Sequence, residues 1–280
     1  MKIAYFPNQI ALNGQLTLRA FLEGAKKHNF TPVENKLDAD AAVIWSVLWN
    51  GRLAPNKVVY DTYRSQGKPV FILEVGALKR GWTWKVSVNH ITAQGIYGNQ
   101  ENLDMSRPGK IGVRLFEPQH NRKPHILIAG QHQKSLQWEG QLPMDQWALE
   151  KIKQVRKHTD LPILVRPHPR SRFALTSSDA SLISPVKLPN THEEYDLNYN
   201  CHCVINHNSG PSVSAAIRGT PVICDQTSLA WEISDAMENI EKIQLKDRKD
   251  WFTRICHTEW TNQEIQTGDP LSRLIPYIRY

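Results

Sequence analysis

The chain has 280 residues, of which 40% are hydrophobic and 22% are charged. This composition excludes a disordered, fibrous or very small protein, and the length allows one large domain or two modest ones. No apolar run approaches the about 20 residues that a membrane-spanning helix needs, and the first residues lack the features of a secretory signal. We therefore expect a cytoplasmic protein with no membrane partner, whose four cysteines are reduced thiols.

Positive charge is concentrated in the first part of the chain. Residues 1 to 120 hold 15 Lys plus Arg against 9 Asp plus Glu, a net charge of +6, whereas residues 121 to 280 hold 19 against 18, a net charge of +1. A basic half is typical of a protein that binds a polyanion such as nucleic acid, although many basic proteins bind none.

Short runs rich in Val and Ile alternate with segments of helical periodicity, which predicts an α/β fold with parallel sheets. In the first half we expect strands at residues 2 to 6, 41 to 47 and 69 to 75, and helices at 15 to 28 and 56 to 66. The first helix should face the sheet with Leu16, Ala20, Leu22 and Ala25, and the second should end at Gly67, which suits a left-handed helix terminus.

Residues 98 to 122 are rich in Gly, Pro, Asn and Gln and are typical of a linker. We therefore expect a boundary near 120 that divides a domain of residues 1 to 120 from one of residues 121 to 280. In the second half we expect strands at 125 to 129, 162 to 165, 204 to 206 and 221 to 224. Pro143 should open one helix, and another should run from Pro211 to Arg218 and stop at Gly219.

Three polar segments directly follow predicted strands, at the sheet edge where open α/β sheets bind ligands. The first is Arg166-Pro167-His168-Pro169-Arg170, in which two prolines stiffen a turn. Guanidinium groups offer paired donors and histidine adds another, so this turn is a candidate grip for a diphosphate. The alternative is a solvated basic loop.

The second segment, from Asn208 to Ser214, lies between a strand and a helix. Small residues let a phosphate approach backbone N–H groups, Ser209 and Ser212 add hydroxyls, and the helix N-terminus adds partial positive charge. An ordinary capped helix is the alternative. The third segment is Gly130 to Ser135. Further along, Glu232 is a candidate acceptor for ribose hydroxyls, or else a solvated helix residue.

These segments resemble the donor domain of GT-B glycosyltransferases of the capsule-polysaccharide type, over about residues 125 to 235. The resemblance implies two Rossmann-like domains facing a cleft, with residues 121 to 280 binding a nucleotide sugar of the UDP-sugar type and residues 1 to 120 binding the acceptor. It implies that His168, Ser209 and Gly210 hold the nucleotide diphosphate. The full set of candidate donor-binding residues is Gln131, Ser135, Arg166, His168, Arg170, Asn208, Ser209, Gly210, Ser212 and Glu232.

The first half is similar to small glycosyltransferases encoded by tailed phages, through residues 67 to 78 and 82 to 86. Some of these proteins are associated with glucosylation or arabinosylation of hydroxymethylated or hydroxylated pyrimidines, such as hydroxymethylcytosine, in phage DNA. The resemblance implies a duplex DNA acceptor and, for a phage protein, the host cytoplasm. The extra length of the capsule enzymes is missing.

A DNA acceptor would fit a cluster of cations and tryptophans after the third predicted strand. Lys79, Arg80 and Lys85 would pair with phosphates, while Trp82 and Trp84 would stack on a flipped or strained base. The alternative is that both tryptophans are core or hinge residues.

Sugar transfer needs a stabilised leaving group and a base for the acceptor hydroxyl. Arg166, His168 and Arg170 are the candidates for the first task. Glu74 is the candidate base, because it interrupts an apolar strand near its carboxyl end. The alternative is a structural pair with Lys79 or Arg80.

We expect no required metal. Asp38-Ala39-Asp40 has the DxD pattern of metal-dependent transferases of another fold but reads as a solvated loop, and Cys201-His202-Cys203 with His207 lacks the spacing of a zinc site. The leading hypothesis is a glycosyltransferase acting on modified pyrimidines in phage DNA. The alternatives are a glycosyltransferase for a capsule or cell-surface glycan, and a non-catalytic nucleic-acid-binding protein on a transferase scaffold.

Overall fold

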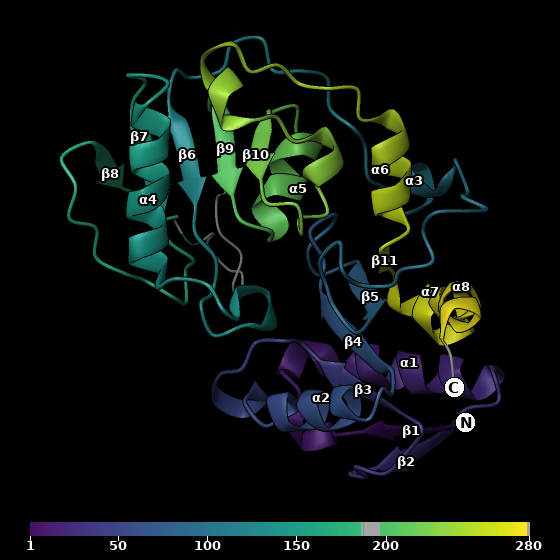
Figure 1. Ribbon diagram of the computed structural model, residues 1–280. Helices are drawn as coiled ribbons and strands as arrows, with labels where there is room; N and C mark the ends of the chain where they lie inside the picture. The colour runs from purple at the N-terminus through teal and green to yellow at the C-terminus, as the bar shows by residue number, and fades with distance from the viewer. Residues whose placement is uncertain (186, 188–196, 279–280) are drawn as a thin grey trace. The chain divides into compact units, whose positions relative to one another are not determined.

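The computed structural model describes residues 1–185, 187 and 197–278 and divides into two compact units (Figure 1). Unit 1 comprises Met1–Arg114, Lys134–Gln137 and the segment from Asp250 onward. Unit 2 comprises Leu115–Gln133 and Trp138–Lys249. Each unit is built around its own sheet.

The sheet of unit 1 has six strands in the order β11-β5-β4-β3-β1-β2. The first four strands in the sequence run parallel, β5 is antiparallel to β4, and β11 is antiparallel to β5. The bounds are β1 Lys2–Tyr5, β2 Thr31–Glu34, β3 Ala41–Trp45, β4 Val70–Val75, β5 Trp84–Val88 and β11 Glu259–Trp260. The strands predicted at 41 to 47 and 69 to 75 are therefore confirmed to within two residues.

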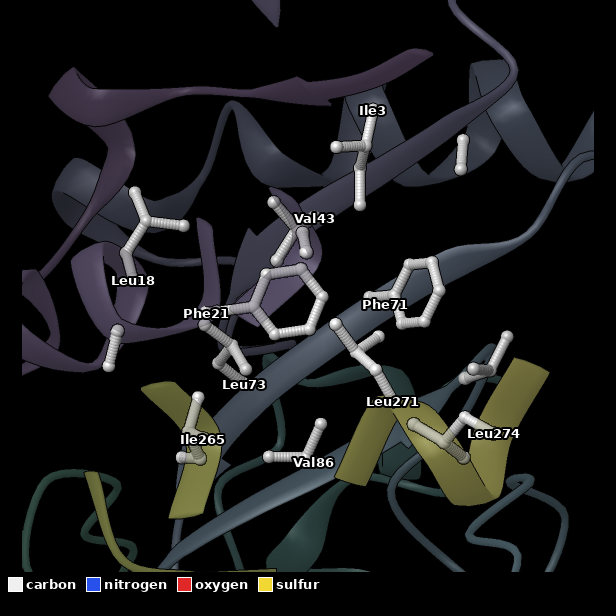
Figure 2. Close-up of a cluster of buried hydrophobic side chains, with 14 of the residues drawn as sticks. Ile3, Leu18, Phe21, Val43, Phe71, Leu73, Val86, Ile265, Leu271 and Leu274 are labelled. Carbon is white, nitrogen blue, oxygen red and sulfur yellow. The ribbon is translucent and has the colours of Figure 1, made fainter. Parts of the chain in front are cut away.

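Both faces of this sheet are covered, and its central strands β3 and β4 are accordingly nearly continuous apolar runs. One face packs against α1 (Gln15–Lys27), α7 (Asn262–Thr267) and α8 (Asp269–Leu274), and Figure 2 shows Phe21, Ile265 and Leu271 beside Phe71 and Leu73 of β4. The other face packs against α2 (Asn56–Ser65). Each fully buried Leu, Ile or Phe contributes about 1.5–3 kcal/mol to such a core.

The predicted inward face of α1 is partly wrong. Leu16 is 66% exposed, and the buried face is formed by Thr17, Leu18, Ala20, Phe21, Gly24 and Ala25. Gly24 is needed because a Cβ there would lie 2.2 Å from the carbonyl oxygen of Ile265, so α1 and α7 approach closely only with a glycine.

The sheet of unit 2 has five parallel strands in the order β10-β9-β6-β7-β8. α4 (Met144–Arg156), which follows Pro143 as predicted, covers one face, and α5 (Gly210–Ile217) packs on β9 and β10. The strands are β6 Ile126–Ala129, β7 Ile163–Arg166, β8 Ala180–Leu182, β9 Cys203–Asn206 and β10 Val222–Cys224. The predicted two-domain α/β architecture with parallel sheets is thus present.

The division of the chain differs from the predicted one at the C-terminus. The units separate between Arg114 and Leu115, near the expected boundary, but the segment from Asp250 onward, assigned to the second domain by the sequence, belongs to unit 1. The physical reason is that Trp260, Ile265, Leu271 and Leu274 complete the apolar core on β4 and β5. The remaining helices are α3 (Arg107–Lys110) and α6 (Lys249–Cys256).

Within the described part of the chain, every helix is too short or too polar to cross a bilayer.

Candidate functional site

The loops that follow four strands of unit 2 leave from one edge of the sheet, because the strands are parallel. These loops are residues 130–133 after β6, 167–171 after β7, 207–209 with the start of α5 after β9, and 225–228 after β10. We call them the unit 2 loop cluster. Since β6 pairs with both β7 and β9, its loop lies between theirs, and most of the polar residues that the sequence placed after strands meet there.

A chain of hydrogen bonds joins three of these loops. The side-chain Nε2 of Gln131 donates to Asn208 Oδ1 at 3.0 Å, and the Asn208 backbone N–H donates back to Gln131 Oε1 at 3.3 Å. Asn208 Nδ2 donates to Thr227 Oγ1 at 2.9 Å, and that hydroxyl donates to Asp225 Oδ1 at 2.7 Å. Gln131 and Asn208 are both buried, so they act as supports that fix the loops.

His168 lies on the other side of the loop after β6. Its ring meets that of His132 edge-on, with centroids 5.3 Å apart. Its Nδ1 accepts the backbone N–H of Arg170 at 3.1 Å, which leaves the proton of the neutral ring on Nε2. His168 is partly exposed, so this turn presents a nitrogen donor of the kind that binds phosphate oxygens.

The two arginines that flank His168 are placed differently. Arg166 is buried, donates to the carbonyl oxygen of Asn198 at 3.2 Å and stacks over the Tyr199 ring at 4.9 Å. These contacts engage its guanidinium within unit 2 and weigh against the predicted grip on a phosphate. Arg170 is exposed.

The start of α5 supplies the third part of the cluster. Ser209 is its N-cap and is partly exposed, as is Gly210 at the first helical position. Ser212 does not fit its predicted role, because it is fully buried and its hydroxyl is shared with the Ser209 carbonyl and Ser228 Oγ, each at 3.0 Å. Ser212 therefore fixes the helix start against the loop after β10.

Two further predicted donor residues lie elsewhere. Ser135 belongs to unit 1, where it forms a β-bridge with Leu48. The predicted helix around Glu232 is a single 3-10 turn, Trp231–Ile233, and Glu232 is exposed on it.

The structure adds polar residues that the sequence did not assign to the donor site; His207 was considered only for zinc. His207 is buried with its ring 5.1 Å from that of Trp138, and burial lowers the pKa of this histidine while Asp225 raises it. Burial raises the pKa of Asp225, but the bonds from Thr227 and the nearby His207 and Lys151 outweigh it and leave the pKa below its usual value. His207, Asp225 and Thr227 follow strands as the predicted residues do, and that position was the available signal.

In unit 1, Glu74 lies at the carboxyl end of β4 and is partly exposed. Its Oε2 accepts the Ser46 hydroxyl at 2.6 Å and the Val47 N–H at 3.4 Å, and its Oε1 accepts the Val75 N–H at 2.8 Å. The alternative partners considered from the sequence, Lys79 and Arg80, are exposed, and the hydrogen bonds of Glu74 go to other groups.

The predicted nucleic-acid residues fall into two sets. Lys79, Arg80 and Trp82 are exposed, with the Lys79 ammonium 5.2 Å from the Trp82 ring centre. Trp84 and Lys85 are 6% and 8% exposed. Their predicted contacts with DNA are wrong, because Trp84 packs against Trp45 in the core and the Lys85 ammonium donates to the Ile91 carbonyl.

Among the residues that the structure describes, no three His, Cys, Asp or Glu side chains are grouped to hold a metal ion. Asp40 accepts the Lys2 backbone N–H at 2.7 Å. Burial raises the pKa of the Cys201 thiol to about 12, so it stays protonated at neutral pH.

Comparison with solved structures identifies the fold. The beta Kdo 2,4 transferase of Thermosulfurimonas dismutans KpsC aligns with a TM-score of 0.55 at 16% identity, over 91% of this chain and 89% of that chain. The beta Kdo 2,7 transferase of the same protein aligns with a TM-score of 0.50 at 13% identity, over 96% of this chain and 99% of that one. No family model and no curated protein matches the sequence. The chain thus has the two-domain α/β fold of GT-B type that these transferases share.

Proposed function

We propose that this protein transfers a sugar from a nucleotide-activated donor to an acceptor hydroxyl, with the donor phosphate bound by the unit 2 loop cluster. The observation that carries the proposal is the joining of loops from adjacent parallel strands by Gln131, Asn208 and Thr227, next to His168 and the start of α5. Its support from comparison is that both aligned structures are named as transferases of a sugar, Kdo.

The proposed donor contacts come from the exposed members of this cluster. His168 would donate through Nε2 and Arg170 through its guanidinium, while Ser209 and Gly210 would receive the phosphate at the start of α5. Helix N-termini and charged donors stabilise negative charge, which grows on the phosphate as the glycosidic bond breaks. Gln131 and Asn208 would act by holding these loops.

Glu74 is the proposed base that takes the proton of the acceptor hydroxyl. Three donors hold its carboxylate at the end of a parallel strand, where open α/β sheets present functional groups. A positioned carboxylate accelerates such a proton transfer by about 10²–10⁴-fold.

For the acceptor, we propose a hydroxylated pyrimidine in duplex DNA as the first substrate to test. Its support is the net charge of +6 over residues 1 to 120 and the exposed group of Lys79, Arg80 and Trp82. The burial of Trp84 and Lys85 removes two of the five expected contacts. A capsule or cell-surface glycan, the alternative drawn from the sequence, is the second candidate acceptor to test.

The test is incubation with nucleoside diphosphate sugars, including UDP-sugars, and nucleoside monophosphate sugars, together with hydroxymethylated DNA, plain DNA or a Kdo-containing glycan. Product is read by nucleoside or glycan mass. Donor binding without turnover, or DNA binding without donor binding, would favour the non-catalytic protein.

Two variants test the roles. His168→Ala should weaken donor binding about 10- to 100-fold in calorimetry and leave DNA affinity intact, whereas Glu74→Gln should bind donor normally and lose transfer. His120→Ala and Glu23→Gln are matched controls, since both side chains are exposed outside the candidate site. Equal loss of donor and DNA binding in His168→Ala would mean that the residue holds the fold, and turnover by Glu74→Gln would remove it from the base role.

A further inference from the structure

A row of polar side chains crosses one face of the unit 1 sheet. Glu74 of β4 is in register with Lys85 of β5, and Lys85 is in register with Glu259 of β11. Directly paired residues on neighbouring strands share a face and lie close together. Ser46, which follows β3, bonds to Glu74 at the other end. We call these four residues the Glu74 row.

Lys85 is the member that needs an explanation, because a lysine is almost never buried without a charged partner. Only 8% of it is exposed, and its ammonium donates to the Ile91 carbonyl at 3.3 Å. Burial lowers the pKa of Lys85, while Glu259 and Glu74 raise it. The fold thus keeps a cation between two carboxylates at an energetic cost.

Glu259 does not require that cation. It is 1% exposed, and its two oxygens accept the Ala77 N–H at 2.6 Å, the Leu78 N–H at 3.1 Å and the Thr83 hydroxyl at 2.8 Å. These donors already satisfy the carboxylate and tie the loop after β4 to β11. The other carboxylate beside Lys85 is Glu74, the more exposed of the two.

Ser46, which donates a hydrogen bond to Glu74, has a strained backbone conformation. Ser46 is 4% exposed and has φ +66°, a left-handed conformation that is uncommon for serine. Two hydrogen bonds hold this turn. The Ser46 N–H donates to the Leu73 carbonyl oxygen at 2.7 Å, and Asn56 Nδ2 donates to the Trp45 carbonyl oxygen at 2.7 Å. Such strain persists where the surroundings enforce it, and it is concentrated at functional sites.

We infer that Lys85 is a positioning residue for Glu74: it is paired directly across from Glu74 on β5, and its buried cation orients the Glu74 carboxylate at the end of β4 from the side opposite Ser46. The inference rests on the proposed function, in which Glu74 is the base. Its consequence is that replacing Lys85 should change the pH dependence of sugar transfer. The other titratable groups facing Lys85 are Glu259 and, through Glu259, the buried Tyr97, whose pKa burial raises well above its usual value.

The direct test is to titrate Glu74 itself. With glutamate labelled at the carboxyl carbon, the signal that disappears in Glu74→Gln is that of Glu74. In Lys85→Met its titration should move to higher pH, as expected when a neighbouring positive charge is removed. The acidic limb of the transfer rate should move with it. Lys85→Arg should restore both, and Lys2→Met, an exposed lysine on the same sheet, should change neither.

A second measurement covers the case in which Lys85→Met does not fold. Coupling between two charges is reciprocal, so Glu74→Gln, at a partly exposed site, should lower the pKa of Lys85 followed by its side-chain NMR signal. An unshifted Lys85 in Glu74→Gln, or an unshifted Glu74 in folded Lys85→Met, overturns the inference even in an active enzyme. Failure of the wild type to transfer any sugar contradicts the proposed function instead, whatever the titrations show.

Discussion

Cys256 illustrates how burial sets the chemistry of single residues in this protein. All four cysteines are free and buried, and burial raises the pKa of the Cys256 thiol to about 12, although Arg107 opposes the rise. A thiol whose pKa is higher in the folded state than in the unfolded chain stabilises the fold fully below its unfolded pKa. That contribution is lost as the pH rises from about 9 towards 12.

Cys256 should therefore make unfolding easier in alkali. Between pH 9 and 10.5 the unfolding free energy of the wild type should fall more steeply than that of Cys256→Ser, by about 1.4 kcal/mol per pH unit for this one thiol. Urea unfolding at several pH values measures the slope. Cys256→Ala is the control for the loss of packing, because it should share the shallow slope of the serine variant. Equal slopes in all three proteins would show that the buried thiol does not contribute.

At the scale of elements, seven strands were predictable, because most of them are short buried runs rich in Val and Ile: β1, β3 and β4 of unit 1 and β6, β7, β9 and β10 of unit 2. The short or more polar strands β2, β5, β8 and β11 were not predicted. The loops after β6, β7 and β9 were found for the same reason, since each begins where such a run ends. The support of Gln131 by Asn208 was not predictable, because it joins residues 77 positions apart.

Strand β5 shows what local sequence cannot reveal. The sequence placed Lys85 with Lys79 and Arg80 in a group of cations expected to pair with DNA phosphates. In the structure β11, from residues 259 and 260, pairs with β5, and both faces are covered. Lys85 lies in the interior, where its ammonium bonds to the Ile91 carbonyl.

Arg107 connects α3 to the segment that returns to unit 1. It is 4% exposed, donates to the carbonyl oxygens of Cys256 and Glu259 at 2.6 Å each, pairs with Glu264 and lies 3.9 Å from the Trp260 ring centre. Burial raises the pKa of Glu264, but the hydrogen bonds from Arg107 and Thr261 outweigh this effect and leave the pKa below its usual value. Glu264 is therefore ionised at neutral pH.

Removing this guanidinium takes the cationic partner from a half-buried carboxylate and the side-chain donor from two carbonyl oxygens. Arg107→Ala should lower the unfolding free energy by about 3–5 kcal/mol in urea denaturation, and Arg107→Lys should recover only part of it because lysine lacks the paired donors. Lys110→Met, on the same helix but exposed, should unfold like the wild type. A loss in Arg107→Ala no larger than in Lys110→Met would refute this role.

At the scale of the whole molecule, the chain leaves unit 1 at Arg114, re-enters it briefly at Lys134–Gln137 and returns to it for the last time at Asp250. The Gly- and Pro-rich residues 98 to 122 indicated the point where the chain leaves unit 1. The sequence did not indicate the return, because an amphipathic C-terminal helix such as α7 carries no mark of which core it joins. Unit 2, in contrast, is nearly continuous in sequence and has its own apolar core around α4.

This asymmetry predicts how fragments will behave. Residues 115–249 should fold alone, with a cooperative thermal transition, because they contain the core formed by Ile128, Trp147 and Val165. Residues 1–114 should not, since they lack Ile265, Leu271 and Leu274 and expose the apolar face of β4 and β5. Adding residues 250–280 through a flexible linker should restore a cooperative transition in circular dichroism and scanning calorimetry. Cooperative unfolding of residues 1–114 alone would show that the returning segment is dispensable, and the place of α7 and α8 in the unit 1 core would then have to be reconsidered.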